Sequence, residues 1–227
     1  MKNTFLFPVL VTFGLISFEM KAQENVSVTY SNEQQFLFNI FNTRRSVRQF
    51  LSTPVPMEHI NKILEIAKSG PTAGNQQPWK FLVVQNREKL NELKQASITK
   101  DIELYNNYKK MTNKEEANIR KKIDENLSGY LSAPVYIVVL SDTTSMYPSY
   151  NIKDVSIAAG YLLIAARALG YGSVFCTDSF TPEVIKQVFN IPDKYEVICS
   201  IPVGVPVKWP EPKSKKSLEE VVIYEKF

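Results

Sequence analysis

Histidine is nearly absent from this sequence, and cysteine is scarce. The 227 residues include one histidine, His59, and two cysteines, Cys176 and Cys199. A histidine-rich metal cluster is therefore excluded, and a Ser-His-Asp triad would depend on His59 alone. His59 adjoins the apolar stripe of a predicted helix, so we expect neither a metal site nor histidine-based catalysis. Sequence alone leaves open whether the two cysteines pair.

The sequence also lacks repeats, low-complexity runs and long blocks of like charge. Its 44% apolar and 22% charged residues are an ordinary globular composition. The net charge of +4 arises from mixed signs, as in residues 109–122, which are typical of a solvated helix. We therefore expect no nucleic-acid partner. Because no linker divides the chain after residue 22, we predict one domain over residues 23–227.

An apolar run marks the N-terminus of the chain. Lys2 precedes apolar residues 5–18, and the small residue Ala22 follows shortly after. This order predicts a secretory signal peptide over residues 1–22. The run is too short and too broken by proline and glycine to predict a membrane span in the mature chain. We expect an exported, periplasmic protein, or a cytoplasmic one if this segment is instead an amphipathic or buried helix.

Hydrophobic periodicity predicts a mixture of helices and strands. Helical spacing of apolar residues predicts helices over 32–43, 57–68, 87–97, 100–126 and 152–169, and another that begins at Thr181-Pro182. Apolar, β-branched runs predict strands over 81–84, 133–141, 173–176 and 196–207. With few hairpin signals, this pattern favours an α+β or α/β arrangement around one sheet. The helix over 152–169 is apolar around much of its circumference, so it requires burial in the core or at a dimer interface.

The segment RRSVRQF concentrates cationic side chains. Arg44, Arg45 and Arg48 surround Ser46. Guanidinium groups bind phosphate through paired hydrogen bonds, and a hydroxyl adds a neutral donor. In an extended segment Arg44, Ser46 and Arg48 would share one face. This pattern indicates a phosphate site, although a solvated basic turn would give the same pattern.

The segment GPTAGNQQPW is a second candidate ligand site. Small residues at 72–74 allow a ligand to approach the backbone closely. Asn75 and Gln77 offer donors and acceptors suited to the edge of a heteroaromatic ring. Taken alone, the segment also fits a simple turn before a strand.

Together these segments resemble the nitroreductase family of flavin mononucleotide (FMN) enzymes. The matching segments are RRSVRQF, GPTAGNQQPWKFLVV, LSAPVYIVVL, DVSIAAGYLLIAARALGYGSVFCTD and the tail from IPVGVP through KSKKSLEEVV. Their order and spacing agree with the family over about residues 36–222. The resemblance implies an α+β, nitroreductase-like fold: a central mixed, mainly antiparallel sheet flanked by helices. It also implies a long central helix at the interface of a homodimer that binds FMN between its subunits.

The resemblance also assigns roles to the phosphate-binding residues. Arg44 and Ser46 match positions that hold the FMN phosphate, and Arg45 occupies a matching motif position from which it would contribute. Lys215, with Lys213 beside it, stands where the family commonly has an arginine that closes this site. Lysine lacks the bidentate fork of arginine, so this departure implies a weaker grip on the phosphate.

Other matched positions surround the flavin ring. Arg48 matches a cation near the pyrimidine end of the ring, where negative charge collects on reduction. Asn126 matches, by a looser alignment, an asparagine that bonds the polar edge of the ring. The loop expected to reach the flavin from the other subunit contains Pro71, Thr72, Ala73 and Asn75, with Gln77 orienting it. The turn expected to face the ring near N5 contains Cys176, Thr177 and Asp178.

The resemblance implies an FMN-dependent oxidoreductase with ping-pong kinetics. NAD(P)H or another donor would reduce the flavin at N5, and a nitroaromatic, quinone or similar small conjugated molecule would accept the electrons. No side chain needs to act as a nucleophile. The alternative is an exported flavin- or ligand-binding protein that kept the fold without catalysis.

Two short motifs indicate other classes of enzyme. Ser97 and Lys100 satisfy the S-x-x-K pattern of penicillin-binding serine hydrolases, but the companion motif precedes the serine instead of following it. Gly170-Tyr171-Gly172 is an isolated GxG that follows a helix, whereas a dinucleotide fingerprint follows a strand. We interpret the second motif as a helix stop.

Overall fold

The computed structural model describes residues 29–227, and the predicted signal peptide lies outside them. The helices are α1 (Asn32–Thr43), α2 (Met57–Ala67), α3 (Arg87–Tyr108), α4 (Asn113–Leu131), α5 (Asn151–Ala168), α6 (Pro182–Phe189) and α7 (Leu218–Val221), with short 3-10 turns η1 (Ala73–Asn75) and η2 (Pro148–Tyr150). The strands are β1 (Trp79–Val84), β2 (Val135–Asp142), β3 (Gly172–Ser173) and β4 (Tyr195–Gly204).

One sheet forms the centre of the molecule, with the strand order β1-β2-β4-β3. Every pair of neighbouring strands is antiparallel. An isolated parallel bridge between Ser46 and Ser173 adds the segment after α1 to one edge. The α+β class and the mainly antiparallel sheet are thus confirmed.

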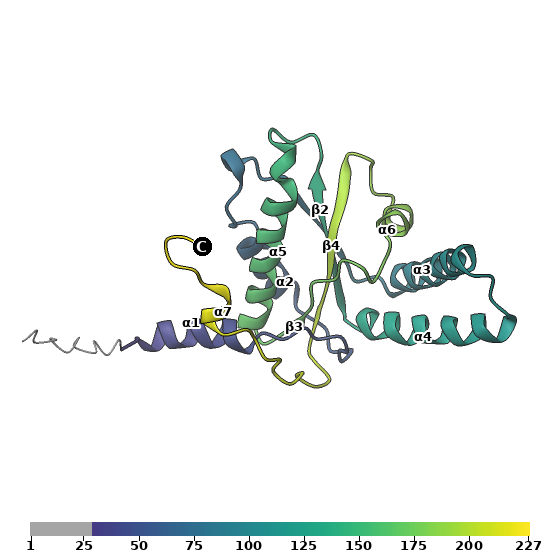
Figure 1. Cartoon of the computed structure of the whole chain (residues 1–227), viewed down its shortest axis with the longest axis horizontal. Helices are drawn as coiled ribbons and strands as arrows, with labels where there is room; N and C mark the ends of the chain where they lie inside the picture. The colour runs from purple at the N-terminus through teal and green to yellow at the C-terminus, as the bar shows by residue number, and fades with distance from the viewer. Residues whose placement is uncertain (1–28) are drawn as a thin grey trace, which may run out of the picture.

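The side chains of β2 pack in two separate cores, one on each face of the sheet, because successive side chains of a strand point to opposite faces. Val135, Ile137 and Val139 pack in the core shared with α2 and α5. Tyr136 and Val138 pack in a second core with residues of α3, α4 and α6. Figure 1 shows α5 and α2 on one side of the sheet and α3, α4 and α6 on the other.

Helix α5 is buried where it faces the sheet and open where it faces away. Ala158, Ala159 and Leu162 are fully buried. Ile157 and Tyr161 are exposed on the outer side, and a Cβ atom added to Gly160 would meet nothing within 4 Å in the described structure. The apolar circumference predicted for this helix is therefore only partly covered within one chain.

The boundaries predicted for the charged helices were wrong. The break falls at residues 109–112, between α3 and α4, and not near residue 98. Thr112 begins α4 with a capping box, in which its side chain accepts a hydrogen bond from Glu115 N and the Glu115 side chain bonds the Thr112 backbone. The strand predicted over 173–176 is also shorter, because only Gly172 and Ser173 pair within β3.

Candidate functional site

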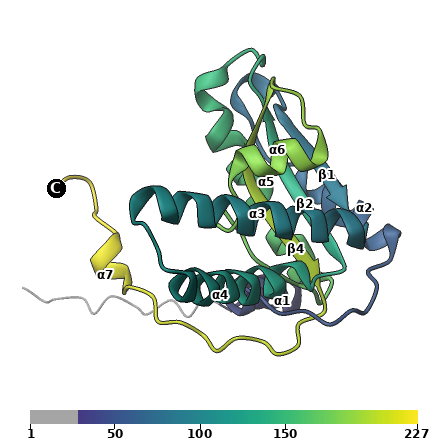
Figure 2. The same cartoon turned by 90° about the vertical axis from the view of Figure 1, so that its right-hand side faces the viewer.

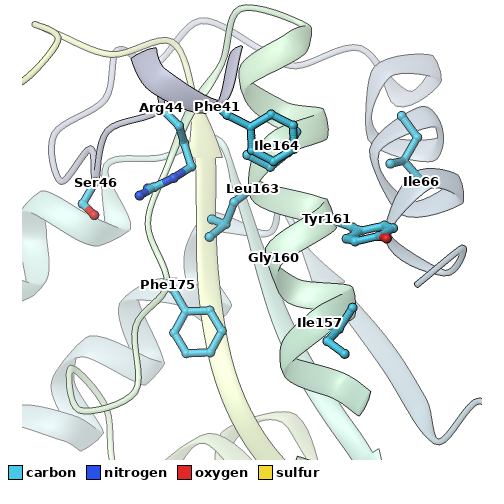
Figure 3. A pocket seen from close by; sticks show the side chains of 10 residues that line it. All are labelled: Phe41, Arg44, Ser46, Ile66, Ile157, Gly160, Tyr161, Leu163, Ile164 and Phe175. Atoms are coloured by element: carbon cyan, nitrogen blue, oxygen red, sulfur yellow. The ribbon is translucent and has the colours of Figure 1, made fainter. Parts of the chain in front are cut away.

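A cavity of about 650 Å³ opens along the outer face of α5 (Figure 3). Arg44 and Ser46 contribute charge and a hydroxyl to a lining that is otherwise mainly apolar. The remaining lining residues are Phe41, Ile66, Ile157, Gly160, Tyr161, Leu163, Ile164 and Phe175. Its size falls within the range of roughly 300–1,000 Å³ typical of sites for small molecules and cofactors.

The end of α1 and the edge of the sheet place Arg44 and Ser46 at this cavity. The backbone of Arg44 is extended, with φ −61° and ψ 134°, so the helix stops there. Val47 then donates a backbone hydrogen bond of 3.1 Å to Ser173 O and buries its side chain. Figure 3 shows the Arg44 guanidinium directed to the side of the cavity where Ser46 lies.

The Arg44 guanidinium has no partner in the described part of the chain. Among residues 29–227 its side chain forms neither an ion pair nor a hydrogen bond, although the residue is half-buried. A cation taken partly out of water needs compensation by an anion or by acceptors. This unpaired cation, beside a hydroxyl in an apolar cavity, therefore favours a phosphorylated ligand with a large apolar part.

Arg45 lies differently from its neighbour. Its Nη1 atom donates hydrogen bonds of 2.7 Å to Asn42 O and 2.8 Å to Arg44 O. The guanidinium thus satisfies carbonyl groups at the end of α1, a common role for a basic residue at a helix C-terminus. Arg45 does not line the cavity described above.

Arg48 and Asn126, which the sequence placed at the polar edge of one ring, line the same second cavity of about 440 Å³. Asn126 belongs to α4, whereas Arg48 lies on the extended segment after α1. The expectation that Arg48 shares a face with Arg44 and Ser46 is met only in part, because the cavities that they line are distinct.

The loop over residues 71–77 is held at the first turn of α5. Ala73 N donates to both carboxylate oxygens of Asp154, at 3.2 and 3.1 Å. Gln76 Nε2 donates to Asp154 Oδ2 at 2.7 Å, and Gln76 Oε1 accepts from Tyr147 N, also at 2.7 Å. These contacts fix the loop from its inner side and leave Asn75 exposed.

The backbone of this loop adopts an uncommon shape. Gly74, Asn75 and Gln77 have φ values of 56°, 55° and 50°, in the left-handed region. The side-chain amide group of Gln77 donates to Asn75 O and to Asn75 Oδ1, so it contacts the loop from within. Strained loops persist when their surroundings over-determine them, and such strain often marks a functional site.

The turn predicted to face a ligand joins the sheet through Cys176. Cys176 and Ser200 exchange backbone hydrogen bonds of 3.0 and 2.9 Å. Thr177 and Asp178 are exposed, whereas Cys176 and Cys199 are both buried free thiols. Burial raises the pKa of the Cys176 thiol to about 11, so it is protonated at neutral pH and is no nucleophile there.

The predicted lysines lie on the C-terminal segment. Val207 N donates a hydrogen bond to Gln49 O. Beyond this residue, no hydrogen bond in the described structure joins residues 208–227 to the rest of the chain. Arg167 stacks on Trp209 at 4.6 Å from the ring centroid, and Figure 2 shows α7 standing away from the body of the protein. Lys213 and Lys215 are exposed and do not line the cavity of Arg44.

Sequence reasoning missed three residues that organise these regions: Gln76, Asp154 and Tyr130. The sequence contained a signal for Asp154: a carboxylate in the first turn of a strongly apolar helix requires buried hydrogen-bond partners. Tyr130 accepts a hydrogen bond of 3.2 Å from Arg48 Nε. No local pattern distinguishes this tyrosine from an ordinary core aromatic residue.

The rival motifs occupy ordinary structural positions. Ser97 is buried on α3 with no hydrogen-bond partner for its hydroxyl in the described structure, while Lys100 pairs with Glu103 at 3.2 Å. His59 bonds the Tyr171 hydroxyl at 2.7 Å through Nδ1. Gly170 has φ 84° and ends α5, as its interpretation as a helix stop requires.

Comparison with known proteins identifies the fold and then the family. A crystal structure of oxidized iodotyrosine deiodinase bound to FMN and 3-iodo-L-tyrosine matches with a TM-score of 0.67 and 26% identity, over 84% of this chain and 100% of the other. The chain belongs to the nitroreductase family, whose family model matches residues 42–205.

Two relatives are similar to this chain in sequence. A Methanothermobacter thermautotrophicus protein, provisionally named NADH dehydrogenase/NAD(P)H nitroreductase, is 32% identical over 74% of this chain and 76% of its own length. An iodotyrosine deiodinase of Thermotoga neapolitana is 27% identical over 83% of this chain and 97% of its own. The relatives of this chain are thus named for more than one reaction.

Proposed function

We propose that this chain is an FMN-dependent oxidoreductase that holds the FMN phosphate at Arg44 and Ser46. The observation that carries the proposal is the guanidinium of Arg44, which has no ion-pair or hydrogen-bond partner among residues 29–227 and lies beside Ser46 in an otherwise mainly apolar cavity. Membership of the nitroreductase family and the FMN-bound structure of a relative support the choice of cofactor.

The residues present fit the chemistry of FMN. Arg44 can offer two parallel donors to a phosphate monoester, and Ser46 can add a third. The apolar walls of the cavity suit the hydrocarbon part of a flavin, while Arg48 and Asn126 provide polar groups for its pyrimidine edge. Lys213, Lys215 and the 176–178 turn remain predicted contacts, as does Arg45.

When bound, FMN supplies hydride transfer through its N5 atom. The protein binds and orients the cofactor, and Arg48 provides positive charge at the edge where reduction adds negative charge. Side chains from the cavity walls exclude water from the apolar part of the site. Because Cys176 is a buried thiol and His59 is engaged with Tyr171, we assign no nucleophile.

The two halves of the predicted site lie at opposite ends of α5, which supports a homodimer. Asp154 in the first turn holds the 71–77 loop, whereas Arg167 in the last turn donates to Thr43 Oγ1 beside Arg44. At about 1.5 Å per residue, these two positions of α5 are roughly 20 Å apart. The loop and the arginine of one chain therefore contact α5 far from each other, whereas those of two antiparallel copies would come together at one cofactor.

Exposed apolar side chains mark the surface on which a second copy would pack. They gather on α1 and on the outer face of α5, and include Phe36, Leu37, Phe41, Ile157 and Tyr161. The C-terminal segment adds Leu218, Val221 and Tyr224. Large exposed apolar patches mark interaction sites, so we propose that two copies bury them together. Sedimentation of the purified protein tests this, and a monomer at micromolar concentration contradicts it.

The proposal also covers the domain limits of the chain and its export. We propose a single domain over residues 23–227 and a signal peptide over residues 1–22. Within the described residues, none of the helices has the length and apolar character that crossing a membrane requires. N-terminal sequencing of protein from its native host tests the cleavage near Ala22, and a mature chain that begins at Met1 contradicts export.

Flavin binding is tested first, and electron transfer is then tested on the FMN-loaded protein. The purified protein is expected to bind FMN and to lose the flavin absorbance with NADH, NADPH or another donor, and then to recover it with a nitroaromatic compound or a quinone. Bleaching by dithionite alone, without turnover of any acceptor, would favour the non-catalytic flavin-binding alternative. Protein that cannot be reconstituted with FMN contradicts both.

Reductive deiodination is a second candidate activity, and the match to relatives of that name over most of their length favours it. The reaction replaces an aryl C–I bond by C–H and releases iodide, at the expense of two electrons and one proton. Adding 3-iodo-L-tyrosine to the dithionite-reduced protein tests this. Stoichiometric iodide release supports deiodination, whereas reoxidation only by nitroaromatics or quinones assigns the first activity.

A further inference from the structure

The guanidinium of Arg48 is fixed by neutral groups of its own chain. Arg48 Nε donates to the Tyr130 hydroxyl at 3.2 Å, and Nη1 donates to Ser46 O at 3.3 Å. Within the described residues no carboxylate pairs with this guanidinium. Its positive charge is therefore oriented but not held in an ion pair, and the exposed side chain remains accessible to a ligand.

Tyr130 is a rigid support for this cation. The residue is 9% exposed and packs with Val174 and Cys176. A tyrosine side chain has few rotatable bonds, and tight packing restricts rotation about them further. The position of its hydroxyl is thus set by the core and not by solvent.

The end of α4 contacts the arginine segment at positions on both sides of Tyr130. A Cβ atom on Gly129 would lie 2.7 Å from Arg48 O, so the two backbones approach as closely as glycine allows. Phe50 N donates to Ser132 Oγ at 2.9 Å. Tyr130 lies between these contacts, so the geometry of its bond to Arg48 follows from the packing of α4 on the segment.

With Nε bonded to Tyr130 and Nη1 bonded to Ser46 O, the Nη2 atom of Arg48 remains available to a ligand. An unrestrained arginine loses side-chain entropy when it is ordered. With the orientation set in advance, much less ordering is required when a ligand binds. The cavity that Arg48 lines is also lined by Asn126, a neutral donor and acceptor, and by Lys122 and Glu125, whose carboxylate lies 3.9 Å from Lys121 Nζ.

We propose that Tyr130 is a positioning residue, which holds Arg48 where its charge stabilises the reduced flavin more than the oxidised flavin. The inference rests on the proposed FMN function. Reduction adds negative charge to the pyrimidine edge, and a cation that is already oriented stabilises this charge without reorganisation. A mobile arginine would have to be ordered during reduction, which lowers the midpoint potential.

A double-mutant cycle on FMN-loaded protein tests this role. We compare wild type, Tyr130→Phe, Arg48→Met and the double variant by dye-equilibrated reduction. Tyr130→Phe is expected to lower the ratio of reduced to oxidised FMN affinity about tenfold, which equals about 30 mV for a two-electron couple. In the Arg48→Met background the same change is expected to leave the potential unaltered, because the group that Tyr130 orients is gone.

Tyr171→Phe is the matched control, because it also removes a tyrosine hydroxyl that bonds one side chain, at His59. It is expected to lower thermal stability without changing the potential. If phenylalanine at 130 prevents folding, Arg48→Lys replaces it, since lysine keeps the charge but lacks Nε, and it is expected to lower the potential.

Four outcomes separate the possible failures. A wild-type potential in Tyr130→Phe, or equal shifts in both backgrounds, overturns the role of Tyr130 and leaves FMN binding intact. An unchanged potential in Arg48→Lys also overturns it. Failure of wild-type protein to bind FMN overturns the proposed function and, with it, the role of Tyr130.

Discussion

Gln76 Nε2 donates a hydrogen bond of 2.7 Å to the Asp154 carboxylate, and this contact joins the 71–77 loop to α5. Asp154 is 5% exposed and accepts in addition from Ala73 N. Ala73 and Gln76 both supply donors, so position 154 requires an acceptor. The first turn of a helix also stabilises a negative charge there. Asp154 therefore determines the shape of the loop that carries the predicted flavin contacts.

Asp154→Ala is expected to destabilise the protein by about 2 kcal/mol, because Ala73 N and the Gln76 amide lose a buried charged acceptor. Urea unfolding measures the change. Asp193→Ala is the matched control, since this exposed aspartate forms a surface ion pair with Lys186 at 3.3 Å, which is worth about 0–1 kcal/mol. Equal losses in the two variants would show that the Asp154 contacts do not support the loop.

Gly74 is expected to resist substitution for two separate reasons. Its φ of 56° disfavours any side chain, and a Cβ atom would lie 2.5 Å from Tyr147 Cε2. Gly170 shares the first reason only, since it has φ 84° and open space around the added atom. Gly170→Ala should therefore cost about 1–2 kcal/mol, and Gly74→Ala should cost more.

Urea unfolding compares the two variants, and Tyr147→Ala removes the clash from one of them. In that background the cost of Gly74→Ala should fall to that of Gly170→Ala, because only the backbone strain remains. If Gly74→Ala is no more costly than Gly170→Ala in the otherwise wild-type protein, contact with Tyr147 does not shape the loop.

Arg44→Ala is expected to weaken FMN binding by roughly 1.5–3 kcal/mol, or about 10- to 150-fold, through the loss of a charge-assisted contact with phosphate. Fluorescence titration of the apoprotein with FMN measures the dissociation constant. Arg45→Ala should have a smaller effect, since Arg45 bonds Asn42 O and Arg44 O. Arg120→Ala, which breaks an exposed pair with Glu116, is the control. An unaltered constant in Arg44→Ala removes Arg44 from the site.

Local sequence predicted the elements whose burial leaves a periodic pattern. The β-branched run around Val135–Asp142 forms β2, one of the two inner strands of the sheet, and α5 lies where its apolar spacing indicated. The α3–α4 break was missed, because a highly charged stretch has no continuous apolar stripe to locate it. Its signal was the capping box between Thr112 and Glu115, a local polar pattern and not a periodic one.

Residues of the candidate site were predictable where they lie close together in sequence. Arg44 and Ser46 share a cavity because they follow one helix end. The bonds from Ala73 to Asp154 and from Arg48 to Tyr130 span about 80 residues each. Such contacts depend on how α4 and α5 pack on the sheet, which hydrophobic periodicity does not specify.

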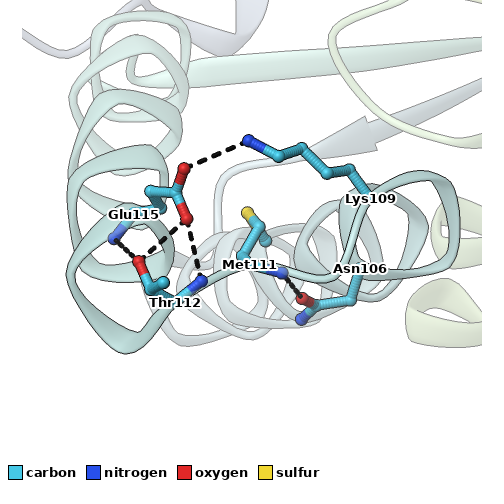
Figure 4. A network of polar contacts seen from close by, with 5 residues as sticks. All are labelled: Asn106, Lys109, Met111, Thr112 and Glu115. Carbon is cyan, nitrogen blue, oxygen red and sulfur yellow. Dashed lines mark hydrogen bonds and ion pairs between the residues drawn. The ribbon is translucent and has the colours of Figure 1, made fainter.

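The turn between α3 and α4 provides a test of pH dependence (Figure 4). Thr112 N and Oγ1 donate to Glu115 Oε2 at 2.9 and 2.8 Å, and Lys109 Nζ lies 3.1 Å from Oε1. The hydrogen bond from the Thr112 backbone is the largest cause that lowers the pKa of Glu115 from 4.5 to about 2. Because the folded pKa is depressed, the stabilising contribution is complete above pH 4.5 and is lost as the pH falls through about 2.

An NMR titration of the Glu115 carboxyl carbon is therefore expected to show a midpoint near 2. Thr112→Val removes the hydroxyl donor, and Lys109→Ala removes the cation. Both variants should raise the midpoint, and neither should restore 4.5 while the Thr112 N–H still donates, since the backbone bond lowers the pKa most. A wild-type midpoint near 4.5 would show that the capping box does not persist in solution, and the α3–α4 turn would then lack the contact that fixes where α4 begins.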